Sequence, residues 1–156
     1  MDYIPLITET ELKELSLLDY NLSSDYIYPV LKYVQENKLF RILGEDFYND
    51  IILKYTTEDY DYILNNYIKP VLLWGLMSEI QVPLNFKFRN QGMFNTNNPD
   101  GNNIILDDIK YTKNHYEKNA KFYEDRLIKH LTDNKLNYPL WIGCSMVKNY
   151  NSNITL

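Results

Sequence analysis

Ten residues near the middle of the chain, VLLWGLMSEI from Val71 to Ile80, are apolar on nearly every side of a helix. A helix at a protein surface has one apolar and one polar face, whereas a helix that is apolar all round must be covered by other elements. The segment therefore predicts the central core helix of an α-helical domain. At 156 residues the chain is long enough to cover it, since a domain of this size buries roughly 70% of its unfolded surface.

The first forty residues carry the end signals of two helices. Thr8 and Glu11 have the spacing of a capping box, which predicts that a short helix begins there. Ser24 is expected to cap a second helix that ends at Gly44. Gln35 falls on the apolar face of this second helix, so we expect a buried, hydrogen-bonded side chain there.

Further helices are predicted over most of the remaining chain. Residues 46–55 form a short one, and Thr57 caps another that is either kinked at Pro70 or divided there. Pro83 is expected to end the core helix. A last long helix runs from residues 107–108 to about Asp133. The predicted fold class is mainly α, a compact bundle of about five to six helices.

Residues 82–103, between the core helix and the last helix, lack helical periodicity. Two short runs of alternating apolar residues flank an Asn-Gln-Gly turn, which predicts an extended, β-hairpin-like arm. A segment this polar cannot offset its ordering entropy on its own subunit, so we expect neighbouring subunits to order it by strand addition. The candidate contact residues are Phe86, Phe88, Arg89, Asn90, Gln91, Gly92, Met93 and Phe94.

The last long helix has a second stripe opposite its apolar one. Tyr111, His115 and Phe122 fall within a narrow arc of that helix. They are either scattered surface aromatics or a partner interface, and helical geometry alone leaves both alternatives open.

The end of the chain is predicted to be extended. Tyr138, Pro139 and Trp141 form an anchor and are further candidate interface residues, and residues 142–156 are expected to be a flexible tail. Residues 1–141 then make one helical domain, with the arm inserted between its core helices.

The residues that usually carry enzyme chemistry do not form a motif. His115 and His130 are too far apart on one helix to share a metal ion, and a surface position is expected for each. Cys144 has no evident base near it, the five glycines are dispersed, and the paired carboxylates fall at helix starts, where capping explains them. We therefore expect no catalytic residue, no cofactor and no metal site.

The charge and composition exclude further classes of function. A formal net charge of −5 disfavours nucleic-acid binding through phosphate contacts. The longest apolar run is far shorter than the roughly 20 residues that a bilayer span needs, and a single cysteine favours a reducing compartment. We expect a soluble protein made inside the cell, without a signal peptide. Its 15 tyrosines are explained either by the codon usage of an AT-rich genome or by a protein interface.

Several short sequence pieces occur in a fixed order over residues 6–141. They are LIT with Glu11-Leu12-Lys13; Tyr26 with Pro29, Lys32 and Gln35; Ile42-Leu43-Gly44 with Phe47-Tyr48; YIKPVLLW; RNQG; FYEDRLIKHL; and YPLW. In this order the chain resembles the head–tail connector proteins of tailed bacteriophages. The resemblance is to the tail-adaptor or head-completion ring proteins of crAss-like and related Bacteroidetes phages, and residues 142–156 lie outside it.

This resemblance implies a structural virion protein at the head–tail junction, assembled in the host cytoplasm. Such subunits form a homo-oligomeric ring, typically of about twelve copies. The ring docks on the portal protein and on downstream tail or ring proteins, and genomic DNA passes through it without specific binding. An acidic chain suits such a channel wall. The alternative hypothesis is a small helical protein-binding module that forms no ring, and a small enzyme is a third.

Overall fold

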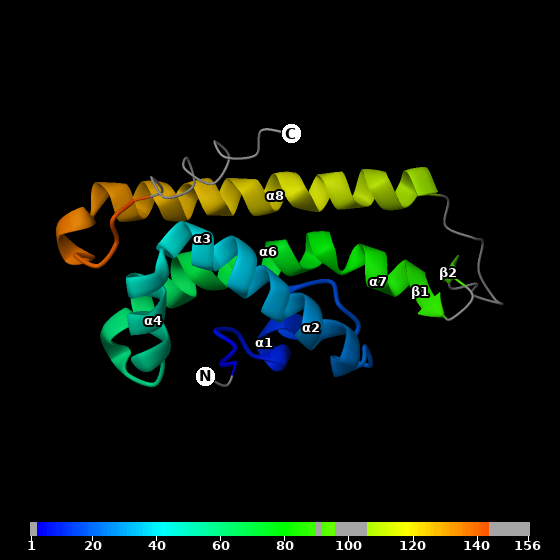
Figure 1. The fold of residues 1–156 in the computed structure, drawn as a ribbon, viewed down its shortest axis with the longest axis horizontal. Helices are drawn as coiled ribbons and strands as arrows, with labels where there is room; N and C mark the ends of the chain where they lie inside the picture. The colour runs from blue at the N-terminus through cyan, green and yellow to red at the C-terminus, as the bar shows by residue number, and fades with distance from the viewer. Residues whose placement is uncertain (1–2, 90–91, 96–105, 144–156) are drawn as a thin grey trace, which may run out of the picture.

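A computed structural model describes residues 3–89, 92–95 and 106–143 of the chain. Its described residues are mainly helical, which confirms the predicted fold class at this level (Figure 1). No helix among them is both long and apolar enough to cross a membrane.

The first half of the chain is a series of helices joined by short turns. In order these are α1 (Glu9–Leu15), α2 (Ser24–Val34), the π-helical η1 (Gln35–Leu39), α3 (Phe40–Leu43), α4 (Glu45–Leu53), the 3₁₀ turn η2 (Glu58–Tyr60) and α5 (Asp61–Ile63). The second half contains a second π-helical turn, η3 (Leu64–Ile68), then α6 (Lys69–Glu79), α7 (Gln81–Asn85), β1 (Phe86–Arg89), β2 (Gly92–Asn95), α8 (Leu106–Asp133) and the 3₁₀ turn η4 (Lys135–Asn137).

Several of the helix ends lie at or next to the residues predicted from capping signals in the sequence. The capping box at α1 is confirmed: the Glu11 amide donates to the Thr8 hydroxyl, and the Thr8 amide donates to the Glu11 carboxylate. Gly44 ends α3 with a φ of 77°, a conformation that favours glycine. The cap of α2 is Ser23 and not Ser24, because it is the Ser23 hydroxyl that accepts from the Asp25 amide.

Two of the long helices contain a π turn, which the sequence pattern did not indicate. Residues 24–43 form one continuous helix with η1 in its middle, and residues 61–79 form another with η3. The predicted kink or break at Pro70 is replaced by η3, which lies directly before the first turn of α6. A proline disrupts the regular hydrogen bonding of the turn before it, and a wider π turn there accommodates the change.

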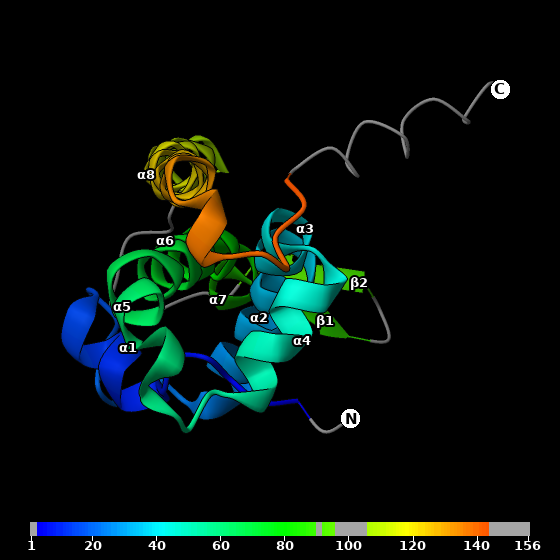
Figure 2. The same ribbon diagram turned by 90° about the vertical axis from the view of Figure 1, so that its left-hand side faces the viewer.

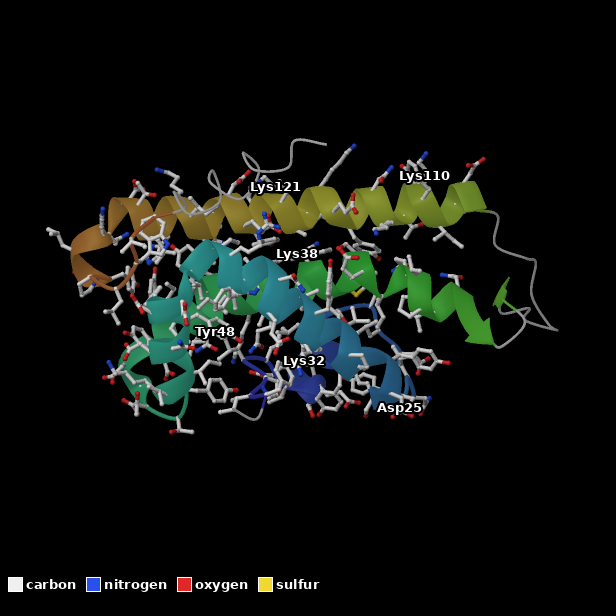
Figure 3. The ribbon with its side chains drawn as sticks, in the orientation of Figure 1. Asp25, Lys32, Lys38, Tyr48, Lys110 and Lys121 are labelled. Carbon is white, nitrogen blue, oxygen red and sulfur yellow. The ribbon has the colours of Figure 1, made fainter. Side chains whose placement is uncertain are left out.

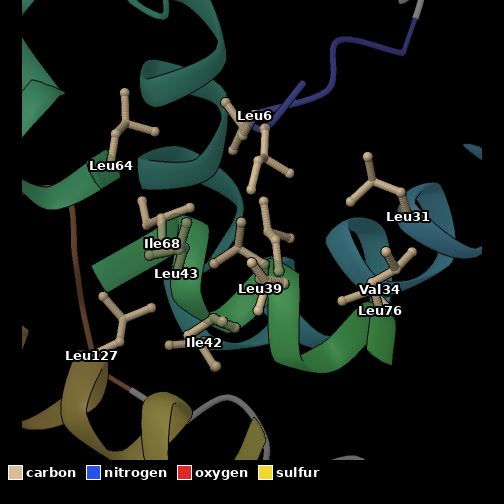
Figure 4. Packing of buried hydrophobic residues seen from close by; sticks show 14 of the residues in the cluster. Leu6, Leu31, Val34, Leu39, Ile42, Leu43, Leu64, Ile68, Leu76 and Leu127 are labelled. Carbon is tan, nitrogen blue, oxygen red and sulfur yellow. The ribbon is translucent and has the colours of Figure 1, made fainter. Parts of the chain in front are cut away.

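The segment that is apolar all round forms α6, as predicted, and lies at the centre of the molecule (Figures 1 and 2). α8 covers one side of α6, and α2 crosses the other so closely that a β-carbon on Gly75 would lie 2.6 Å from the Val34 side chain. Figure 4 shows Val34 and Leu76 at this crossing and Leu127 of α8 on the other side of the core.

The predicted arm over residues 82–103 is wrong at its start. α6 ends at Glu79, and Pro83 lies in the first turn of α7, where the missing proline N–H costs nothing. β1 and β2 pair antiparallel, with Phe86 opposite Asn95 and Arg89 opposite Gly92. Asn90, Gln91 and residues 96–103 lie outside the described residues, so an arm that spans the whole region stays a prediction.

Candidate functional site

Exposed aromatic side chains lie on the outer face of α8. This helix has 28 residues and is packed along α6 by Ile109, Ala120, Leu127 and Leu131, which are buried. On its opposite face Tyr111 is 77% exposed and Phe122 is 62% exposed, and His115 lies exposed between them. We call Tyr111, His115 and Phe122 the outer stripe. Its side chains contribute little to the core of their own subunit.

An ionic bridge joins α8 to two other elements beside the buried residues that orient the outer stripe. The Glu79 carboxylate of α6 lies 3.0 Å from the Lys38 ammonium of η1 and 3.5 Å from the Lys113 ammonium of α8. All three side chains are partly shielded from solvent, near the Lys38 position labelled in Figure 3. One carboxylate therefore joins η1, α6 and α8.

A groove lies beside α8, on the side of α1. It consists of two adjoining hollows of about 480 and 370 Å³ that share Leu15, Leu73 and Trp74 in their walls. The Trp74 ring is stacked on the Tyr123 ring, with ring centres 6.1 Å apart. The Tyr116 ring also contacts Trp74, and the two ring planes are tilted relative to each other. Trp74 is thus half-buried in the wall of the groove.

The rim of the groove combines exposed leucines with an ion pair. Leu15 is 63% exposed and Leu17 is 86% exposed, at and just beyond the end of α1. The Lys69 ammonium reaches the Glu11 carboxylate at 2.5 Å, which ties α6 to α1 below these leucines. The groove therefore offers apolar contact area with a fixed polar edge, a surface suited to another protein chain.

The sequence pattern that defines DUF6712, a family of unknown function, matches residues 27–151, which include nearly all of α2 and every later element to α8. The chain belongs to the DUF6712 family. It matches no curated protein and no solved structure.

The candidate residues at the end of the DUF6712 chain do not form one surface. Trp141, predicted as an interface residue, is buried in the core of its own subunit, where its indole N–H donates to the Ile42 carbonyl at 2.9 Å. Tyr138 is half-buried against the Phe47 ring, and Pro139 is exposed. The expectation that this segment anchors a partner is therefore wrong for Trp141, which anchors the chain to its own core.

For the candidate residues of the arm, the structure gives the position of the backbone in two strands. Phe86, Phe88 and Arg89 lie on β1, and Gly92, Met93 and Phe94 lie on β2. The two strands follow α7 at the end of the molecule away from α4 (Figure 1). The structure does not bring this pair together with the outer stripe.

The histidines of the DUF6712 chain differ in their surroundings. His130 is half-buried, although a surface position was predicted: its ring is stacked 4.0 Å from Tyr67, and Nε2 lies 3.0 Å from the Tyr138 hydroxyl. Within the described residues, no three side chains of His, Cys, Asp or Glu type gather as metal ligands do.

The groove residues were missed by the sequence analysis. Leu15 and Leu17 are apolar residues at the end of α1, beyond the position of Leu12 that the core uses. More leucines at the end of α1 than the core can bury is the sequence signal that could have indicated the groove. Trp74 was expected inside the core, because the helical pattern cannot show that α1 and α8 leave a gap above it.

Proposed function

We propose that this protein is a structural subunit of the head–tail connector of a tailed bacteriophage. It assembles as a ring, docks on the portal protein and lines part of the DNA channel. The observation that carries the proposal is the outer stripe of α8, since exposed aromatic side chains on a rigid helix are typical anchors of protein interfaces. The choice of the portal and tail proteins as partners comes from the sequence pieces that resemble connector proteins.

The strand pair supports the finer part of this proposal, an arm that contacts neighbouring subunits. Within the described residues each of β1 and β2 has one paired and one unpaired edge. An isolated pair of strands is marginally stable, and an unpaired edge is a template for another chain. A neighbouring subunit in a ring would supply that chain.

Replacement of the outer stripe by charge tests the proposal. In the double variant Tyr111→Glu, Phe122→Glu, we expect the melting temperature of the isolated subunit to stay nearly unchanged, because both side chains are outside the core. Ring formation, or docking on the portal, should weaken by about 2 kcal/mol or more, as for buried aromatic anchors of other interfaces. Light scattering of the subunit with and without portal measures the assembled mass.

The control is Asn114→Glu, which adds charge to an exposed position of α8 that is outside the outer stripe. This variant should assemble like the unsubstituted chain. An outer-stripe variant that assembles normally, or one that no longer folds as an isolated subunit, would contradict the proposal.

The groove beside Leu15 and Leu17 favours the second candidate, a helical binding module that forms no ring. The same scattering measurement separates the two functions. A chain of 18.7 kDa that stays monomeric in the presence of portal supports the binding module.

A further inference from the structure

Two apolar surfaces are left uncovered by the described elements of a single chain. One is the groove beside α8, where Leu15 and Leu17 are mostly exposed. The other is the outer stripe, where Tyr111 and Phe122 are mostly exposed too. Large apolar side chains that gather at a surface mark contacts with other molecules, whereas single ones need no explanation. A second copy of the chain would offer each surface to the other.

The groove has the length and direction of a helix. Along η3 and α6 its wall runs from Asn65 to Met77, which are about 18 Å apart at the helical rise per residue. Tyr123 of α8 lines the same hollow as Asn65, and Tyr116 lines the same hollow as Met77. The groove therefore runs along both helices.

The outer stripe matches the groove in length. From Tyr111 to Phe122 it covers three turns of α8, which is about 16 Å. A helix packs against other helices by laying a ridge of its side chains in the groove between them. Because the residues of the stripe come from one face of one helix, they can enter one groove together.

The two surfaces also carry opposite charges. Glu14 lies in the groove wall next to Leu15, and its exposed carboxylate has no ion-pair partner among the described residues. Lys118 lies on the outer face of α8, one turn before Phe122, and its exposed ammonium is likewise unpaired in the described part of the chain. The next lysine, Lys121, is held by an aspartate of its own helix. An unpaired carboxylate beside the groove thus complements an unpaired ammonium within the stripe.

The groove and the outer stripe face different directions on the same helix. Tyr123 forms part of the groove wall, whereas the preceding residue, Phe122, belongs to the outer stripe. Successive residues of a helix point about 100° apart. A copy whose stripe lies in the groove of a second copy therefore keeps its own groove open for a third. Contacts between two different surfaces continue in this way from copy to copy, and they close into a ring where the rotation allows.

We propose that the groove binds the outer stripe of the neighbouring copy. The aromatic side chains of the stripe cover the leucines of the groove, and Lys118 of one copy pairs with Glu14 of the next. The proposal rests on the ring-forming function proposed above and names the contact that forms the ring. The groove, which by itself favours a binding module, then receives a helix of the same protein.

A mixture of two full-length variants tests this contact. Tyr111→Glu with Phe122→Glu spoils the stripe and keeps the groove, and Leu15→Glu with Leu17→Glu spoils the groove and keeps the stripe. All four side chains are mostly exposed, so both variants should fold, which circular dichroism checks. In sedimentation velocity each variant alone should stay at 18.7 kDa. Their mixture should give a 1:1 complex and nothing larger, because only one stripe and one groove remain intact.

Other occupants of the groove give other results. If two stripes packed on each other, the variant with the intact stripe would associate alone. If a different protein or another part of the same chain filled the groove, the mixture would contain no complex. Either result would overturn the contact.

The charge pair is tested within the same mixture. Lys118→Glu, added to the variant with the intact stripe, should weaken the 1:1 complex about tenfold, because it places two carboxylates together. Glu14→Lys, added to the variant with the intact groove, should then restore most of the lost affinity. The control is Glu45→Lys in that second variant, an exposed charge on α4 that should restore nothing. Equal affinities with and without Glu14→Lys would overturn the pairing.

These measurements need no portal, so they are separate from the test of the proposed function. A 1:1 complex in the mixture, together with no ring on the portal, would contradict the function and leave the contact standing. Rings that assemble normally on the portal from the variant Leu15→Glu, Leu17→Glu would overturn the contact and leave the function standing.

Discussion

His130 of α8 contacts Tyr67 of η3 and Tyr138 after η4, and these contacts depend on which of its ring nitrogens carries a proton. The side-chain amide nitrogen of Asn134 lies 3.3 Å from Nδ1 of His130. The same nitrogen donates to the His130 carbonyl, and an amide nitrogen acts only as a hydrogen-bond donor. Nδ1 is therefore the unprotonated nitrogen, and Nε2–H donates to Tyr138. Burial lowers the pKa of His130 below its ordinary value and Arg126 lowers it further, while Asp133 opposes them. The folded protein holds this imidazole neutral.

We expect the stability of the protein to fall as the pH drops below about 6.5, the ordinary pKa of histidine. The unfolded chain binds a proton at that pH more readily than the folded chain does, so acid favours unfolding by at most about 1.4 kcal/mol per pH unit. Urea denaturation at several pH values measures this. In His130→Gln the fall over this pH range should be reduced, whereas His115→Gln, on the exposed face, should keep it. An unchanged pH dependence in His130→Gln would contradict the neutral assignment.

At the scale of elements, Trp141 supplies a hydrogen-bond donor to the end of a helix that is distant in the sequence. The last carbonyls of a helix have no partner within it, and the Ile42 carbonyl near the end of α3 accepts the Trp141 indole N–H instead. These residues are 99 positions apart in the sequence. The contact joins the segment after α8 to the first half of the molecule.

Trp141→Phe should destabilise the protein by about 1–3 kcal/mol, because it leaves the buried Ile42 carbonyl without its donor. The shift of the urea midpoint, at unchanged slope, measures this loss. Trp74→Phe makes the same chemical change at a half-buried ring whose main contact is stacking on Tyr123, and its effect should be smaller. The capping role of Trp141 is refuted if both variants shift the midpoint equally.

The elements that could be predicted from the sequence are those whose signals are local. The capping box of α1, the stop at Gly44 and the bounds of α8 depend on residues within a few positions of one another. The outer stripe follows from helical geometry alone. The groove and the burial of Trp141 could not be predicted, because each depends on how segments distant in sequence approach. The π turn η1 has no comparable local signal, whereas η3 lies directly before Pro70.

At the scale of the whole molecule, α6 is covered on both sides. α8 lies along one side of it, and the helices of the first half lie on the other (Figures 1 and 2). Its residues from Val71 to Ser78 are buried except for Trp74. Opening this helix therefore requires that most of the core separates.

We expect the backbone amides of α6 to exchange with solvent only through global unfolding. The amides of α7 and of the 3₁₀ turn η4, which have no fully buried residue, should exchange through local opening. Hydrogen exchange followed by mass spectrometry, at increasing urea below the unfolding transition, distinguishes the two. The layered arrangement would be contradicted by an α6 that exchanges as fast as α7.

The two π turns also bear on how the length of this protein can change in evolution. A π turn contains one residue more than the α-helical turn it replaces, so the loss of one residue within it restores an ordinary α turn. Ile42 and Leu43 beyond η1, and the apolar wall of α6 beyond η3, would then keep facing the core. Loss of a residue elsewhere in the same helices rotates everything beyond it by about 100°. Single-residue deletions in these helices should therefore be tolerated at the exposed residues of the two π turns, which are Glu36, Asn37, Asn65 and Asn66, and purged from the turns on either side.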